Sequence, residues 1–199
     1  MATLNATNLK HGSSSSNNIV LASDGAVTFS GNATCSGTAT GFGGGKVLQV
    51  QQTVKTDTAS ESIASGVPTS TVYLQVNITP ASASNKILIM VTANVSDNGT
   101  VAIILQKDGS NLNGATGDAA GNRERTTAAT SSDASARLHT INATYLDTAG
   151  GTSQITYGIK LFCQDNNTST IYLNRMEDSY DQVYGYRSPS MIQVMEIEA

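Results

Sequence analysis

The sequence of 199 residues contains no tryptophan, three prolines and two cysteines, and charged residues make up 13% of it. Globular proteins usually contain about 25% charged residues. The 11 Lys and Arg residues against 15 Asp and Glu residues give a net charge of −4. Because a nucleic-acid-binding protein needs a basic face to neutralise phosphates, we expect no nucleic acid as a partner.

Long apolar runs are also missing. The longest run, Lys86-Ile-Leu-Ile-Met-Val91, has the length of one strand, whereas a helix that spans a bilayer needs about 20 apolar residues. This predicts no membrane insertion. The first residues, Met1-Ala-Thr-Leu-Asn5, lack the basic start and apolar stretch of a secretory signal. We therefore expect synthesis in a cytoplasm.

Few side chains are suited to chemistry. The distant Cys35 and Cys163 are interpreted as two buried thiols in preference to a disulfide. Neither His11 nor His139 has a second ligand at metal-binding spacing, so no metal site is predicted. By its parity in an expected strand, His139 is interpreted as a polar-face residue. Cys163, His139 and Asp165 match a nucleophilic triad in composition only, because no tight turn with backbone donors surrounds the cysteine. We expect no enzyme.

Clusters of carboxylates and glycines have simpler explanations than ligand binding. Residues 165–167 and 177–181 do not follow the spacing of a calcium loop, so both are interpreted as turns. Residues 41–46 lack the Gly-Lys-Ser/Thr ending of a phosphate loop and are interpreted as a hinge. No cofactor is therefore predicted.

Residues 1–45 have little material for a core, because serine and glycine dominate and Lys10 and Asp24 are the only Lys, Arg, Asp or Glu residues. Apolar residues nevertheless flank Asp24-Gly25, which is a hairpin signal. We predict an extended, Gly/Ser-rich N-terminal arm that docks by adding strands or apolar side chains to a partner. The predicted lattice anchors are Ile19, Leu21, Val27 and Phe29.

A six-residue unit occurs twice in this arm, as Phe29-Ser-Gly-Asn-Ala-Thr34 and Cys35-Ser-Gly-Thr-Ala-Thr40. Copies of such a unit from several chains can pack their first residues around a shared axis, as in a short fibre shaft. A flexible Ser/Gly linker in which two units match by accident is the other interpretation. Both remain open at this point.

From residue 46 onward, short β-branched segments alternate with turn residues. Within residues 71–79, for example, apolar and polar side chains alternate, so one face covers a core. The eight predicted strands are residues 46–56, 71–79, 86–92, 100–106, 136–146, 154–163, 170–174 and 190–197.

This pattern predicts an all-β fold, with residues 46–199 forming an antiparallel jelly-roll β-sandwich. The first and last of its strands are expected to be neighbours in one sheet. Residues 109–133 are too long and too rich in small residues for a hairpin, so we predict an exposed loop with a brief strand near residues 123–125.

Tyrosines gather late in the chain beside arginines. Aromatic rings and planar guanidinium groups can stack on sugars or fill a protein interface. Ordinary packing at the sandwich edge or between subunits is the alternative. The residues of the candidate binding tip are Tyr184, Tyr186 and Arg187.

Three phrases resemble structural proteins of tailed bacteriophages, especially marine and cyanobacterial ones. Residues 17–29 resemble N-terminal arms of their virion proteins. Residues 45–58 and 76–91 resemble the start of a C-terminal β module that occurs on fibre-like and decoration-like proteins. Residues 188–198 resemble the closing strand of that module.

The resemblance implies a virion component, a homotrimer and no catalytic motif. We expect a trimeric capsid decoration or head-fibre protein, made in the host cytoplasm and anchored by its arm with the jelly roll outward. The alternative is a tail-fibre tip or receptor-binding module that recognises host cell-surface carbohydrate. A depolymerase is a third interpretation, but no set of acid, base and metal ligands stands out.

Overall fold

The computed structural model describes residues 6–30, 46–64, 66–97, 99–131, 137–164, 168–178, 181–183 and 185–199. The chain divides into two compact units, Met1–Gly43 and Gly44–Ala199. The predicted repeat and hinge, with Cys35, lie outside the described residues. Each unit is described separately below.

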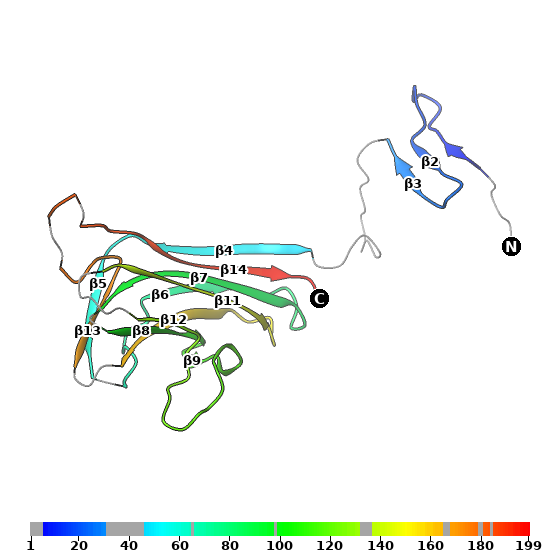
Figure 1. Ribbon diagram of the computed structural model, residues 1–199. Coiled ribbons are helices and arrows are strands. Elements are labelled where there is room, and N and C mark those ends of the chain that lie inside the picture. Colours follow the sequence, from blue (N-terminus) through cyan, green and yellow to red (C-terminus); the bar gives the residue numbers. More distant parts are fainter. Residues whose placement is uncertain are drawn as a thin grey trace. The chain divides into compact units, whose positions relative to one another are not determined.

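The N-terminal unit contains a small antiparallel sheet with the order β1-β2-β3 (Figure 1). Its strands are β1 (Asn8–Leu9), β2 (Ile19–Leu21) and β3 (Val27–Phe29). The predicted hairpin at Asp24-Gly25 is confirmed, because β2 and β3 pair on either side of it. Gly25 has a φ of 86°, which glycine adopts without steric cost, and the carboxylate of Asp24 accepts the Ala26 N–H at 2.9 Å.

The second unit consists almost entirely of strands. They are β4 (Val47–Lys55), β5 (Ala59–Ile63), β6 (Leu74–Ile78), β7 (Lys86–Ser96), β8 (Thr100–Lys107), β9 (Ser110–Asn111), β10 (Ala128–Ser131), β11 (His139–Thr148), β12 (Ile155–Gln164), β13 (Ser169–Leu173) and β14 (Ser190–Ile197). One 3-10 turn, Asn113–Ala115, lies between β9 and β10. All strand pairings are antiparallel, so the predicted all-β class is confirmed.

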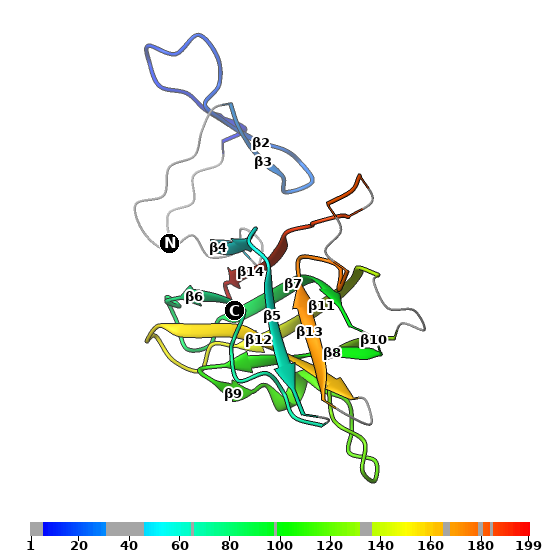
Figure 2. The same cartoon turned by 90° about the vertical axis from the view of Figure 1, so that its left-hand side faces the viewer.

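Two sheets build this unit. One has the order β10-β8-β12-β6, with the short β9 beside β8. In the other, β4, β14, β7 and β11 lie side by side, and β13 with β5 continues along the far end of β7 (Figures 1 and 2). The first and last long strands, β4 and β14, are neighbours as predicted.

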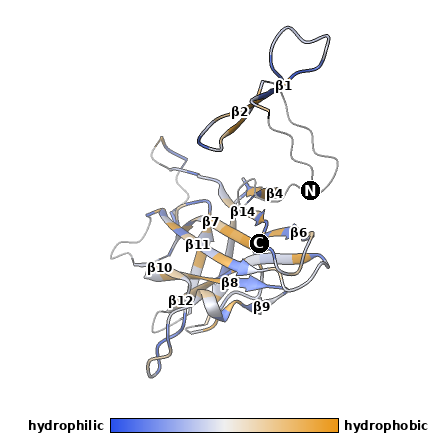
Figure 3. Cartoon of the chain, turned by 90° about the vertical axis from the view of Figure 1, so that its right-hand side faces the viewer, coloured by the Kyte–Doolittle hydropathy of each residue, from blue (hydrophilic) through white to orange (hydrophobic). Residues whose placement is uncertain are grey.

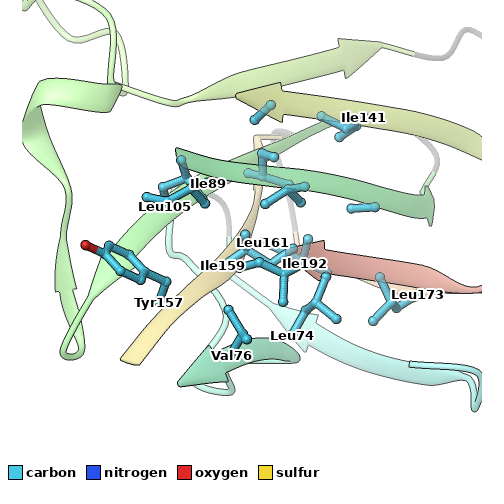
Figure 4. Packing of buried hydrophobic residues seen from close by; sticks show 14 of the residues in the cluster. Leu74, Val76, Ile89, Leu105, Ile141, Tyr157, Ile159, Leu161, Leu173 and Ile192 are labelled. Carbon is cyan, nitrogen blue, oxygen red and sulfur yellow. The ribbon is translucent and has the colours of Figure 1, made fainter. Parts of the chain in front are cut away.

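The core lies between the two sheets and takes alternate side chains from both (Figure 4). In β6 and β14 every second residue is buried, which is the pattern of strands with one face on a core. Ile89 and Ile192 come from one sheet, and Leu74, Leu105 and Ile159 come from the other. The arrangement is therefore a two-layer β-sandwich.

The eight predicted strands all form, but the prediction for residues 109–133 is partly wrong. Residues 123–125 form no strand, and the strands in this interval are the two-residue β9 and, after residues 123–125, β10. Thr127 and β10 pair with β8, where the small side chains of Ala128-Ala-Thr-Ser131 form a short edge strand. Among the described residues, β5 and the two-residue strands β1 and β9 are further strands that the sequence did not predict.

Candidate functional site

The four predicted anchors lie on one face of the N-terminal sheet. Ile19 pairs directly with Phe29, and Leu21 pairs with Val27. Directly paired residues and residues two apart in a strand point to the same side of a sheet. Leu9, which pairs with Ile19, belongs to this side too. We name these five residues the anchor face.

The anchor face is largely open to solvent: Leu9, Leu21, Val27 and Phe29 are exposed, and Ile19 is half-buried. The opposite side carries Val20 and Thr28, which pair with each other. Three strands of two or three residues cannot bury enough apolar surface to be stable alone. The anchor face is thus a surface that gains stability when a partner covers it.

The candidate tip lies in the connection between β13 and β14. This connection begins at Asn174, whose position is fixed by hydrogen bonds. Asn174 is buried and has a φ of 62°, a left-handed conformation that asparagine tolerates better than most residues. Its side-chain amide donates 2.8 Å hydrogen bonds to the carbonyls of Lys55 and Asp57. Its backbone N–H donates to the carbonyl of Asn94. Asn174 therefore fixes the base of the connection to two other strands.

The end of the connection is held by the same network. Ser190 Oγ donates to Asn174 Oδ1 and accepts the Asn94 N–H at 2.9 Å. The Asn94 side chain donates to the carbonyl of Pro189 at 2.7 Å. Buried polar groups that are satisfied in this way hold a unique geometry. Both ends of the connection are therefore positioned, although its outer part is exposed.

Tyr186 is 66% exposed and Val183 is 96% exposed, while Arg187 is also at the surface. Tyr184, the third predicted tip residue, lies outside the described residues. Tyr186 and Arg187 line a shallow depression together with Arg175 and Met176. The guanidinium of Arg175 lies 4.2 Å from the centre of the Tyr172 ring, a cation–π contact at the base of this region.

A separate groove of about 220 Å³ lies on the outer side of the β8 and β12 sheet. Its floor includes Ala102 and Phe162, and its walls include Arg123, Glu124 and Thr126. Ala102 and Phe162 also pack with Ile104 in a small apolar cluster. The groove is smaller than the roughly 300 to 1,000 Å³ of most small-molecule sites. Sequence reasoning missed this groove, because its residues come from three separate segments.

Two partly buried polar clusters contain side chains with shifted pKa values. Glu61 accepts hydrogen bonds from the Ser70 N–H at 2.7 Å and from the Tyr73 hydroxyl at 2.8 Å. Burial opposes ionisation of Glu61, but these donors outweigh it and lower its pKa. Burial, with the hydrogen bond to Glu61, raises the pKa of Tyr73 to about 12.

The second cluster joins Asp147 to Lys107 and Tyr157, each at 2.7 Å. Burial opposes ionisation of Asp147, but the Lys107 ammonium and the Tyr157 hydroxyl lower its pKa. Burial is also the main cause of the raised pKa of Tyr157. In both clusters the carboxylate accepts hydrogen bonds from other segments of the chain, and none of these residues lines the groove or the depression. We interpret both as structural.

Cys163 and His139 lie at the core, not at an open site. Cys163 is buried, as predicted, and its thiol donates to Asp97 Oδ2 at 2.6 Å. The interpretation of His139 as a polar-face residue is wrong. Residue 139 shares its side of β11 with the buried Ile141 and Ala143, and its Nε2 is buried without a hydrogen-bond partner in the described part of the chain.

Within the described ranges, no group of three or more His, Cys, Asp or Glu side chains could hold a metal ion. The same residues include no helix long and apolar enough to cross a membrane. No protein-family model matches the chain, and the comparison with curated proteins found no significant match.

Proposed function

We propose that this chain is a structural protein of a tailed-bacteriophage virion, specifically a trimeric capsid decoration or head-fibre protein. In this proposal the N-terminal unit anchors the protein to the particle and the β-sandwich faces outward. Synthesis takes place in the host cytoplasm. The proposal assigns no enzymatic role, cofactor or nucleic acid partner.

The anchor face is the observation that carries this proposal. Four residues selected from the sequence as lattice anchors lie together on one exposed apolar side of a sheet that is too small to be stable alone. Such a sheet can bind a partner in two ways: its apolar side can pack against the partner, or its edge strand can pair with a strand of the partner. Trimerisation would multiply this affinity through effective concentration.

The order of the sandwich strands supports the same module. We interpret the orders β4-β14-β7-β11 and β6-β12-β8-β10 as a jelly roll, because successive long strands alternate between the sheets as two Greek keys require. The sequence resemblance to phage decoration-like and fibre-like proteins supports it as well. A sandwich of this kind presents loops at its ends for contacts with the surroundings.

Labelling of purified virions tests the proposal. Gold-conjugated antibody against the β-sandwich should decorate particles of the encoding phage, and its position separates head from tail. Leu21→Glu should abolish incorporation because it places a charge on the anchor face. Val20→Glu is the matched control: it adds the same charge one residue earlier, on the opposite side of the sheet. Unlabelled particles, or equal incorporation of both variants, would contradict the proposal.

The second candidate is a tail-fibre tip or receptor-binding module for host cell-surface carbohydrate. The exposed side chains of Tyr186 and Val183 favour it, because an open aromatic ring can stack on a sugar. Binding of the protein to host cells is the assay. Unchanged binding after Tyr184→Ala combined with Tyr186→Ala would remove this candidate.

A further inference from the structure

The outer side of the β4, β14, β7 and β11 sheet is apolar where a solvent-facing sheet is normally polar. Residues that pair across the strands form rows on this side. One row consists of Val50, Met195, Leu88 and Leu146, which are successive partners on the four strands. Val54 and Met191 begin a second row, and Val47 and Ile197 begin a third. We name these eight residues with Met90 the outer apolar face.

Exposure makes this face unusual. Val47, Val50, Val54 and Leu146 are each between 47% and 51% exposed. Leu88, Met90, Met191, Met195 and Ile197 are half-buried by their neighbours. Figure 3 shows β7, the central strand of this sheet, coloured as hydrophobic along most of its length. Scattered surface valines need no explanation, but a row that crosses four strands indicates a contact surface.

The polar residues among these rows are nearly all uncharged. Gln52 pairs with Gln193, and Thr92 donates a 2.9 Å hydrogen bond to Asn142 Oδ1. Lys86 is the charged residue of the described rows, and it lies at the end of the face, where its ammonium binds Thr148 Oγ1 at 2.8 Å. Amides and hydroxyls both donate and accept hydrogen bonds. Copies of this face can therefore converge around a three-fold axis without like-charge repulsion, so the face is chemically suited to contact other copies of itself.

We propose that the outer apolar face is the surface on which copies of this chain associate. This inference rests on the self-association included in the proposed function and assigns it to named residues of the β-sandwich. The alternative occupants, which are the N-terminal unit and a different virion protein, are separated by the test below.

The size of the face predicts the strength of this contact. Four strands about 4.8 Å apart and eight residues long present on the order of 400 Å², about half of the roughly 800 Å² that each partner buries in a stable interface. Association through this face should be weak by itself and strengthened by any second contact in the full chain. It should consequently depend on protein concentration.

Sedimentation equilibrium of the full chain at several concentrations is the first test. We expect an average mass above the 20.6 kDa of one chain. Val50→Glu combined with Leu146→Glu should raise the dissociation constant at least about tenfold, since like charges would be buried against each other. Val67→Glu combined with Val183→Glu is the matched control, because it adds two charges at exposed valines outside the face. Circular dichroism would verify that each variant is folded.

A second measurement needs no variant. Met90, Met191 and Met195 lie on the outer apolar face, whereas Met176 lies in the connection between β13 and β14. Oxidation by peroxide, followed by peptide mass spectrometry, should slow at these three methionines as concentration rises, with Met176 unchanged.

Three results would overturn the inference: a wild-type mass of one chain at every concentration, association of the face variant equal to that of wild type, or face methionines whose oxidation is independent of concentration. If Leu21→Glu combined with Phe29→Glu dissociates the protein and the face variant does not, the N-terminal unit holds the copies together. Labelled virions in that case would retain the proposed function and reject only this inference. Unlabelled virions, combined with concentration-dependent association through the outer apolar face, would reject the proposed function and retain this inference.

Discussion

The buried carboxylate of Glu196 accepts a 2.6 Å hydrogen bond from the side-chain amide of Asn85, which lies 111 residues earlier in the chain. The same oxygen accepts the Ala81 N–H at 2.7 Å, and the other oxygen accepts Gln49 Nε2 at 2.6 Å. Burial opposes ionisation of Glu196, yet these donors outweigh it and hold the pKa below its usual value. Glu196 thereby joins β4, β14 and the segment before β7.

The first prediction concerns acid stability. The pKa of Glu196 is lower in the folded chain than its usual value of 4.5, so its contribution is complete above pH 4.5 and is lost as pH falls through the folded pKa. Glu61 and Asp147 shift in the same direction. The free energy of unfolding should therefore decrease as pH falls below about 4.5.

Glu196→Gln places an amide where donors converge, so it should cost about 1–3 kcal/mol at neutral pH. It should also reduce the loss of stability in acid. Urea denaturation of both chains at neutral and acid pH measures both effects. An acid dependence identical to that of wild type would show that Glu196 does not contribute to it.

The second prediction concerns a close approach at Gly158. A Cβ at this position would lie 2.7 Å from Val72 Cγ1 and 3.2 Å from the Leu74 carbonyl oxygen. Gly158→Ala should destabilise the sandwich by about 1–3 kcal/mol, because the added methyl group would overlap Val72 and crowd the Leu74 carbonyl of the paired strand. Val72→Ala in the same chain should recover part of this loss. Gly117→Ala, which meets nothing within 4 Å, is the control for urea unfolding midpoints.

The third prediction separates conformation from hydrogen bonding at Asn174. Asn174→Ala loses both side-chain donors and must hold alanine at a φ of 62°, whereas Asn174→Gly loses only the hydrogen bonds. The Asn174→Ala variant should be less stable than the Asn174→Gly variant by about 1 kcal/mol, which is the usual cost of placing a non-glycine residue in the left-handed region. Thermal unfolding of the two variants gives this difference. Equal stabilities would argue against backbone strain.

The fourth prediction concerns the tip. Tyr186 is mostly exposed, so Tyr186→Ala should change the free energy of unfolding by less than about 0.5 kcal/mol. A neutral result makes this variant a clean probe of binding to host cells. A loss above about 1 kcal/mol would indicate that the ring packs against the sandwich and would favour the structural interpretation of the tyrosines.

Local patterns were sufficient to predict the eight main strands, because each has β-branched residues and alternation that turn residues interrupt. The strand β10 was missed, since Ala128-Ala-Thr-Ser131 has no apolar alternation and forms by pairing with β8. Similarly, Ala59–Ile63 contains a glutamate and two serines and becomes β5 beside β13. Such strands depend on a neighbour that only the tertiary structure provides.

The anchor residues were chosen from the sequence for their apolar character, and the register of the hairpin places them on one side. The outer apolar face could not be predicted in this way. Val50, Leu88, Leu146 and Met195 come from four strands and form a row only through the pairing of the sheet. The same holds for Asn174, whose side-chain amide donates to carbonyls that lie more than 100 residues earlier in the chain.

The pairing of β4 with β14 has a consequence for biosynthesis. β4 is the first strand of the sandwich, yet β14 lies between it and β7, so its place in the sheet exists only after residues 190–197 have been made. Until then β4 retains an unpaired edge of nine residues that can bind other extended chains. Completion of the sheet must therefore wait until β14 has been synthesised, and crowded nascent chains are the stage at which this protein is most exposed to misassembly.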